Sequence, residues 1–125
     1  MTREELLRFA AERYSAEAEF PWGDDNCILR HQSNRKWFAA VLRVPYMRLG
    51  LPGEGMADLV NTKCPPLLRG SYLGCPGILP AYHMNKEHWL SALLDGSAED
   101  QVIRELLEIS YDLTKPRKKM QRREG

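Results

Sequence analysis

Pronounced helical periodicity occurs near the two ends of this chain, and the residues between them show the patterns of short strands and turns. Residues 2–16 begin with a capping box, Thr2-x-x-Glu5, and then place their apolar side chains on one helical face. Residues 97–114 show the same pattern with a stronger apolar stripe, and a second capping box begins at Ser97. Two amphipathic helices need an apolar layer to cover, so this arrangement favours a sheet with both helices on one of its faces.

The middle of the chain predicts an antiparallel sheet. Its clearest strand is residues 37–44, because alternate side chains there form an unbroken apolar set. We expect that set to face the helices and the other set to face away; the two sets are Phe38, Ala40, Leu42 and Val44, and Trp37, Ala39, Val41 and Arg43. Further strands are predicted at 27–31, 46–51, 56–62 and 89–94, and a short helix at 67–72. The predicted fold is therefore α+β, a two-layer α/β sandwich with an antiparallel sheet of about five strands and the N- and C-terminal helices on one face.

Charge is distributed in blocks along the chain, although the formal net charge is only +1. Residues 1–25 have a net charge of −4, residues 26–90 of +5, residues 91–114 of −5 and residues 115–125 of +5. Acidic residues thus concentrate in the predicted helices, and basic residues in the predicted sheet and the tail, which predicts a protein with one cationic side. The length predicts a single domain over residues 1–114, followed by a basic, disordered tail over residues 115–125.

Several classes of function lack their sequence signatures here. No apolar stretch reaches the roughly 18 residues of a membrane helix, and the charged N-terminus is unlike a secretory signal, so we expect a cytoplasmic protein without membrane contact. The three cysteines are an odd number without a C-x-x-C pair, which indicates reduced thiols. His83 and His88 lack the helical spacing of a zinc pair, and no P-loop, G-x-G-x-x-G or G-x-S-x-G motif occurs. We therefore expect no metal, no cofactor and no enzymatic activity.

The densest group of polar and aromatic side chains is the decamer of residues 80–89. It contains the candidate pocket residues Tyr82, His83, Asn85, His88 and Trp89. In one interpretation these side chains line a cleft for a ligand or a nucleic acid, with Cys64 as a nearby thiol for catalysis. In the other, His83 and Asn85 hold the loop backbone, while Tyr82 and Trp89 pack beneath the last helix. The sequence leaves both interpretations open.

The decamer, PAYHMNKEHW, resembles the signature of the MmcQ/YjbR family of small bacterial proteins. Four further segments agree with the family in their order, namely FPWGDD at 20–25, VNTKCPP at 60–66, LLDGS at 93–97 and ISYDLTK at 109–115. The resemblance implies DNA binding without a reaction, and a CyaY/frataxin-like fold with a double-wing arrangement. The chain departs from the family pattern at Pro65, where many relatives have an acidic residue, and this changes the entry to the short helix beside Lys63.

The leading hypothesis is a monomeric, non-enzymatic protein that binds nucleic acid, DNA rather than RNA, through the uncovered face of the sheet. Cations neutralise phosphates there, and planar side chains stack on bases. The candidate contact residues are Arg30, Arg35, Lys36, Arg43, Arg48, Lys63 and Lys86. The alternatives are a small-molecule-binding or enzymatic domain that uses the Tyr82–Trp89 loop, and a protein-interaction module that uses the same face.

Overall fold

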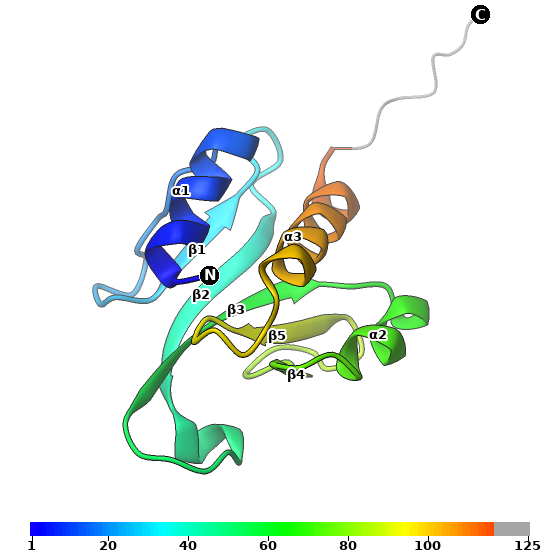
Figure 1. Cartoon of the computed structure of the whole chain (residues 1–125). Coiled ribbons are helices and arrows are strands. Elements are labelled where there is room, and N and C mark those ends of the chain that lie inside the picture. The colour runs from blue at the N-terminus through cyan, green and yellow to red at the C-terminus, as the bar shows by residue number, and fades with distance from the viewer. Residues whose placement is uncertain (117–125) are drawn as a thin grey trace, which may run out of the picture.

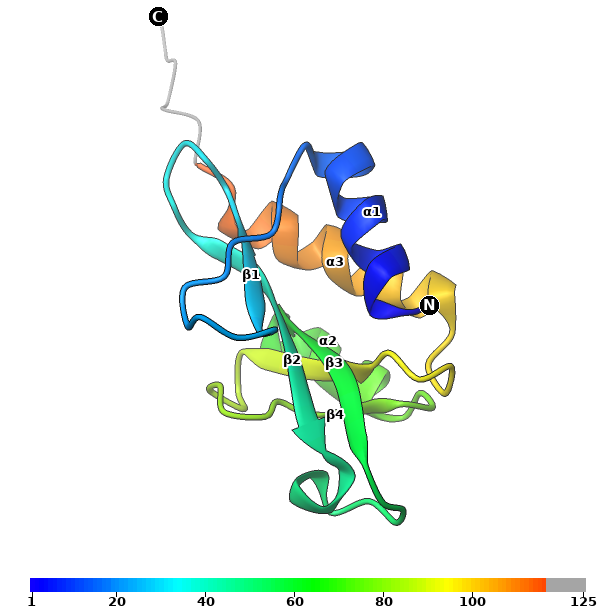
Figure 2. The same cartoon turned by 90° about the vertical axis from the view of Figure 1, so that its left-hand side faces the viewer.

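A five-stranded antiparallel sheet is covered on one side by the first and last helices of the chain (Figures 1 and 2). The computed structural model describes residues 1–116, so residues 117–125 of the predicted tail lie outside the described residues. The elements are α1 (Arg3–Tyr14), β1 (Cys27–Arg30), β2 (Trp37–Pro45), the 3₁₀ helix η1 (Tyr46–Leu49), β3 (Met56–Lys63), α2 (Pro66–Leu73), β4 (Ile78–Pro80), β5 (Trp89–Leu93) and α3 (Asp100–Thr114). The strand order is β1-β2-β3-β5-β4, and the predicted α+β fold is confirmed.

One of the five strands differs from the prediction. Residues 46–51 do not form a strand, because the chain turns into η1 after Pro45 and then reverses at Gly50, whose φ of 71° is in the left-handed region. The remaining strand is instead β4, whose three residues pair with β5. A strand of three residues shows too little alternation for its sequence to reveal it.

The side of the sheet beneath α1 and α3, which we call the helix face, contains the main apolar core. Leu6 of α1 and Ile103, Leu106 and Leu107 of α3 are at most 1% exposed. They belong to one cluster with sheet side chains that include Leu29, Val41, Val60 and Leu90. Burying an aliphatic side chain of this size contributes about 1.5–3 kcal/mol, so these four helix residues anchor both helices to the sheet.

A β-bulge in β2 determines which side chains lie on each face. Leu29 pairs with Ala39 and Arg30 pairs with Trp37, so Phe38 is an extra residue between two pairs. Trp37 faces away from the helices and Phe38 faces them, as predicted. The predicted faces are wrong from residue 39 onward: Ala39 and Val41 lie in the helix-face core, whereas Ala40, Leu42 and Val44 lie on the opposite side, which we call the open face. Strict alternation cannot anticipate an inserted residue, and one insertion reverses every side chain that follows.

The first predicted capping box forms, and the second does not. The Glu5 backbone N–H donates to Thr2 Oγ1 (3.1 Å), and the Thr2 N–H donates to Glu5 Oε1 (2.8 Å). Ser97 instead donates its backbone N–H and its hydroxyl to Asp95 Oδ1, at 3.0 and 2.6 Å. Ser97 therefore closes the turn after β5, and Glu99 is the N-cap of α3. Within residues 1–116, no helix combines the length and the apolar composition that crossing a membrane requires.

β2 and β3 continue past their neighbours as a two-stranded arm (Figure 2). β1 pairs only with residues 37–41 of β2, and β5 only with residues 59–63 of β3, whereas β2 and β3 pair as far as Pro45 and Met56. A smaller apolar cluster on the open face fills the base of this arm. The Tyr46 hydroxyl also donates to Asp95 Oδ2 (2.8 Å). The arm is thus fixed at its base and projects beyond the rest of the sheet.

Candidate functional site

A pocket of about 640 Å³ lies on the open face, and we call it the sheet pocket. Its floor is apolar, because the bulge directs Ala40, Leu42 and Val44 of β2 to this side. Of the described residues that line the pocket, none is acidic. A cavity of this volume is within the range of sites that bind small molecules.

Aromatic rings form the walls of the sheet pocket. Trp22, from the loop between α1 and β1, meets Trp37 of β2 edge to face, with 5.7 Å between the ring centroids. Tyr82 and His83, from the loop between β4 and β5, form a second edge-to-face pair at 4.0 Å. Trp22 is 49% exposed although its ring is large and apolar. Exposed rings beside an apolar floor favour a planar ligand that stacks against them.

A buried polar network holds the Tyr82–His83 wall in place. Asn61 of β3 and Ser91 of β5 are cross-strand partners on the open face, and both are 0% exposed. Asn61 Nδ2 donates to the Tyr82 carbonyl (2.9 Å), and the Tyr82 N–H donates to Ser91 Oγ (2.9 Å). The Ser91 hydroxyl in turn donates to Asn61 Oδ1. These bonds fix the loop backbone over the sheet, and Asn61 also lines the sheet pocket.

Three predicted contact residues lie on the open face without an ion-pair partner within residues 1–116: Arg48, Lys63 and Lys86. Arg48 is exposed and borders both the sheet pocket and a smaller pocket of about 210 Å³. Lys86 borders that smaller pocket, and its Nζ donates to the Ala81 carbonyl (2.9 Å). Lys63 lies opposite Trp89 in the pairing of β3 with β5. The open face thus has basic side chains close to its aromatic pocket.

Arg35 and Lys36 lie at the tip of the β1–β2 hairpin, as predicted, and both are exposed. Two contacts anchor this hairpin to the end of α3. Asn34 Nδ2 donates to the Thr114 carbonyl (2.8 Å), and His31 Nε2 lies 2.9 Å from Thr114 Oγ1. Burial lowers the pKa of His31, because a charged ring would lose hydration there. The hairpin tip is therefore held by a site that favours a neutral imidazole.

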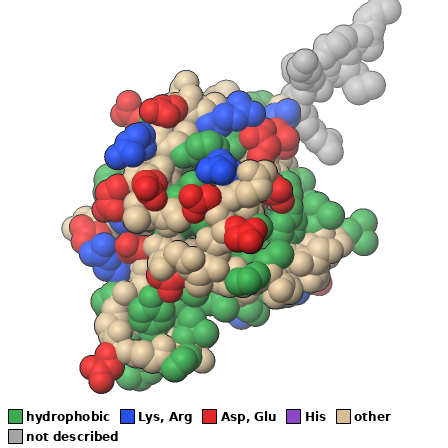
Figure 3. Space-filling view, viewed as in Figure 1, with side chains coloured by type: hydrophobic (Ala, Val, Ile, Leu, Met, Phe, Trp, Pro, Cys, Tyr) green, Lys and Arg blue, Asp and Glu red, His purple; other side chains and the backbone are tan. Residues whose placement is uncertain are grey.

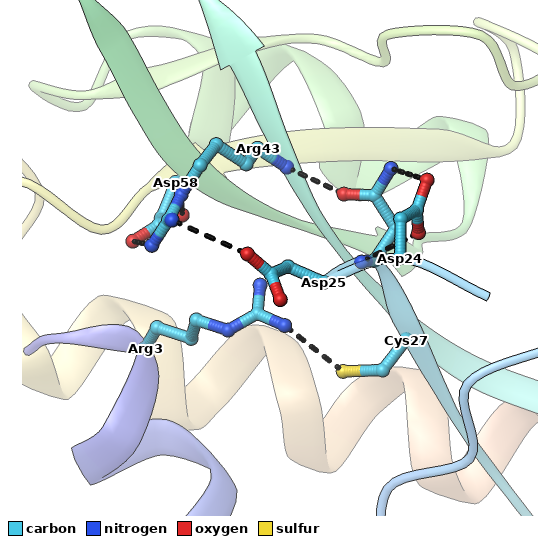
Figure 4. A network of polar contacts seen from close by, with 7 residues as sticks. Arg3, Asp24, Asp25, Cys27, Arg43 and Asp58 are labelled. Atoms are coloured by element: carbon cyan, nitrogen blue, oxygen red, sulfur yellow. Dashed lines mark hydrogen bonds and ion pairs between the residues drawn. The ribbon is translucent and has the colours of Figure 1, made fainter. Parts of the chain in front are cut away.

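Two other predicted contact residues are paired with carboxylates. Arg43 is placed toward the helix face by the reversed alternation, so the prediction that it faces away is wrong. Its Nε donates to Asp58 Oδ1 (2.9 Å), and its Nη1 lies 3.6 Å from Asp25 Oδ2 (Figure 4). The hydrogen bond with Asp58 raises the pKa of Arg43. Arg30 pairs with Trp37 across β1 and β2, and its Nε is 3.2 Å from Glu19 Oε1. Either guanidinium would have to leave its carboxylate before it could bind a phosphate.

The side chains of the Tyr82–Trp89 loop do not converge on one site. His83 borders the sheet pocket, Lys86 borders the smaller pocket, and His88 is exposed and lines neither. Asn85 closes a turn, because its Oδ1 accepts the Glu87 N–H (2.8 Å). The structural interpretation therefore fits Asn85, and the ligand interpretation fits His83.

Other parts of the predicted loop chemistry are wrong. Tyr82 and Trp89 lie on the open face, so they do not pack beneath the last helix. Cys64 belongs to the helix-face core at 1% exposure, and burial raises the pKa of its thiol. Cys64 and His83 are thus on opposite faces and do not form a nucleophile–base pair. Among residues 1–116, no three His, Cys, Asp or Glu side chains come together as possible metal ligands.

The helix side of the molecule differs from the open face in the charge of its side chains. Acidic side chains are spread over the terminal helices, with a few basic ones among them (Figure 3). α3 has four acidic residues and one basic residue. The predicted concentration of acidic residues in the helices thus holds for α3.

Trp22 and Asn61 line the sheet pocket but are not among the predicted contact or pocket residues. A tryptophan between a proline and a glycine is a signal of a ring on an exposed loop. An asparagine inside a strand indicates a buried polar partner, because a strand interior disfavours asparagine unless its amide is hydrogen-bonded. Both patterns are present in the sequence, but neither predicts that Trp22 and Asn61 line the same pocket.

The family model for YjbR matches residues 11–113 of this chain. The chain belongs to the YjbR family. This YjbR protein is 38% identical over 117 residues to YyaQ of Bacillus subtilis (strain 168), covering 92% of the chain and 99% of YyaQ. It is 26% identical over 111 residues to YbdF of Escherichia coli O157:H7, covering 88% of the chain and 81% of YbdF. Both relatives are described as uncharacterized.

Solved structures show the same fold for this YjbR protein. A crystal structure of a protein from Pseudomonas syringae has a TM-score of 0.88 at 38% identity, covering 92% of the chain and 100% of that protein. DR2400 of Deinococcus radiodurans has a TM-score of 0.62 at 24% identity, covering 90% of the chain and 77% of DR2400, and shows a likeness of fold alone.

Proposed function

We propose that this YjbR protein binds nucleic acid, DNA in particular, through the open face of its sheet and its hairpin tips, without catalysing a reaction. The supporting observation is a difference in charge pairing. Arg48, Lys63 and Lys86 on the open face have no ion-pair partner within residues 1–116, whereas Arg13 and Arg43 on the helix side are bound by carboxylates. Unpaired cations can replace the counterions of phosphates, which is the main source of affinity for nucleic acids.

The arrangement of the two hairpins supports the same proposal. Both hairpins share β2, so their tips lie at its opposite ends (Figure 2). One tip has Arg35 and Lys36, and η1 at the other end has Arg48. β2 has nine residues. At about 3.4 Å per residue its ends are roughly 30 Å apart, so a nucleic acid that contacts both tips would cross the open face.

Salt dependence tests the proposal. Fluorescence anisotropy with labelled duplex and single-stranded DNA is expected to show binding that weakens steeply as salt increases. Lys63→Ala and Arg48→Ala should each reduce the slope of log K against log salt concentration by roughly 0.7–0.9, the value of one phosphate contact. The matched control is Arg8→Ala, which removes an exposed arginine from α1 and should leave the slope unchanged. Absence of binding at low salt, or an affinity that does not change with salt concentration, contradicts the proposal.

A further inference from the structure

We propose that the sheet pocket binds the base of a nucleotide, so that the open face takes a single strand with one unpaired base inserted rather than an intact duplex. This inference rests on the nucleic-acid function proposed above and specifies its ligand. It depends on three features of the sheet pocket: its aromatic slot, a buried amide at its base, and the charge around its rim.

The slot fits a planar ring. Its floor is formed by β2 side chains, Ala40, Leu42 and Val44, and the indoles of Trp22 and Trp37 meet above it at 86°. Because the two indoles are nearly perpendicular, a ligand ring that enters the pocket can stack on the face of one indole and contact the edge of the other. Every nucleobase has a flat aromatic face, so this kind of stacking binds bases without strong sequence preference.

The buried amide offers a hydrogen bond to a base edge. Asn61 is 0% exposed and lines the sheet pocket. Its Nδ2 has two hydrogens, and within residues 1–116 the only bond it donates is to the Tyr82 carbonyl. A buried N–H that lacks a partner is unfavourable, so a ring nitrogen or carbonyl oxygen of a base gains this hydrogen bond once the side chains that cover the 0%-exposed amide move aside. The amide therefore favours a heteroaromatic ligand over a hydrocarbon.

The charge around the rim favours a ligand with an anionic group. Arg48 borders both the sheet pocket and the smaller pocket, and Lys86 borders the smaller pocket. Of the described residues that line either pocket, none is acidic. Arg43 also lines the sheet pocket, but its guanidinium lies toward the helix face, where Asp58 binds it. The phosphate on the sugar of the inserted nucleotide would therefore be placed next to Arg48.

An inserted base implies a preference between forms of nucleic acid. A base inside a duplex is stacked and paired, so it must leave the helix before it can enter a pocket. A base in a single strand has no such cost. The sheet pocket should therefore raise the affinity for single strands above the affinity for a duplex, which the basic side chains alone would not do.

The test compares three probes on the full chain: a labelled single strand of roughly twelve nucleotides, within the usual site sizes, the corresponding duplex, and a free mononucleotide. Trp37→Leu and Trp22→Leu each remove one ring of the Trp22–Trp37 pair, and Trp22 is 49% exposed on a loop, so its loss should hardly affect folding. The matched control is Trp89→Leu, which removes a tryptophan from the same face of the sheet but outside the pocket. Affinity and quenching of tryptophan fluorescence are measured, and melting curves check each fold.

Tighter binding of the single strand than of the duplex is expected. Each slot variant should lower single-strand affinity by about 5- to 150-fold, the range for one stacked base, with little change for the duplex or for Trp89→Leu. Equal affinity for both forms, or slot variants that bind the single strand as the parent does, overturns this inference and leaves salt-dependent binding intact. Quenching by the mononucleotide without any binding of oligonucleotides supports the pocket assignment and overturns the nucleic-acid function.

Discussion

On the helix face of the sheet, apolar side chains fill the space beneath two helices, whereas on the open face similar side chains form the floor of a pocket. The same strand, β2, supplies both surfaces. Val41 is buried against the helices, and its neighbour Leu42 lines the sheet pocket. The two faces also differ in charge, because Arg43 is paired with Asp58 toward the helix face and Arg48 has no such partner within residues 1–116.

This difference shows that hydrophobicity alone does not separate core from site in this protein. An apolar face becomes a core when another element covers it, and it stays available when none does. The distinguishing features of the open face are its exposed rings and its unpaired cations. Matched residues on the two faces should therefore respond differently to substitution.

The first comparison uses Trp37 and Phe38, adjacent residues of β2 that lie on opposite faces of the sheet. Phe38→Ala should destabilise the protein by about 3–5 kcal/mol, because Phe38 is fully buried and its ring contacts Tyr14, His31 and Tyr111. Trp37→Leu should lower the free energy of unfolding much less, since Trp37 is only half-buried. Chemical denaturation measures both. Similar losses for the two variants would contradict the assignment of Phe38 to the core and of Trp37 to the open face.

The second comparison uses neighbouring polar residues of β3. Asn61→Leu should cost about 1–3 kcal/mol, because it leaves the Tyr82 carbonyl and the Ser91 hydroxyl without their partner. Amide exchange of Tyr82 should also become faster as its loop loosens. Denaturation and hydrogen exchange provide the two readouts.

The matched control for Asn61→Leu is Thr62→Val on the helix face. Thr62 is fully buried, and its Oγ1 has no hydrogen-bond partner within the described part of the chain. Replacing that hydroxyl by a methyl group should therefore leave stability unchanged or raise it. If Thr62→Val were as damaging as Asn61→Leu, the network around Asn61 would have no special role.

The third comparison concerns pH. Burial lowers the pKa of His31 below its ordinary value of 6.5, so the unfolded chain binds more protons than the folded one just below that pH. Stability should fall as pH decreases through 6.5, by at most about 1.4 kcal/mol per unit, and should level off below the folded pKa. Melting temperatures between about pH 5 and pH 7 measure the effect.

His31→Gln should remove this part of the pH dependence. His83→Gln is the control, because it removes one imidazole from an exposed position on the open face. An identical pH profile for His31→Gln and the parent would contradict a lowered pKa of His31 in the folded protein.

The smallest effect on stability is expected for the exposed ion pair of Arg43 with Asp58. Exposed pairs gain little, because water and salt screen them. Arg43→Ala should therefore change both the melting temperature and nucleic-acid affinity only slightly, whereas Arg48→Ala should weaken binding. Thermal melts and anisotropy titrations test the two variants side by side. Equal losses of affinity would mean that charge pairing does not distinguish the two arginines.

The elements that local sequence determines were predictable. The capping box at Thr2 and the apolar stripe of α3 depend on residues within a few positions of one another, so their patterns suffice. β4 and η1 were missed because they depend on pairing with β5 and on a turn after Pro45. Ser97 failed as a cap because Asp95, two residues earlier, binds it instead.

The candidate site was predictable only in part. Lys63 and Arg48 lie on the predicted side, but Arg43 does not, because the bulge at Phe38 comes before it in the strand. Both alternating sets of β2 are mostly apolar, so the sequence offers no mark of the inserted residue. The sheet pocket joins Trp22, Trp37 and His83 from three distant segments, and no local pattern indicates that they meet.

The projecting arm of β2 and β3 has a consequence for divergence within the family. Its outermost pairs, Val44 with Ala57 and Pro45 with Met56, lie beyond the partners of β1 and β5. Insertions or deletions of paired residues there would lengthen or shorten the arm and leave the central sheet intact. The length of this arm can therefore change within the family without rebuilding the fold.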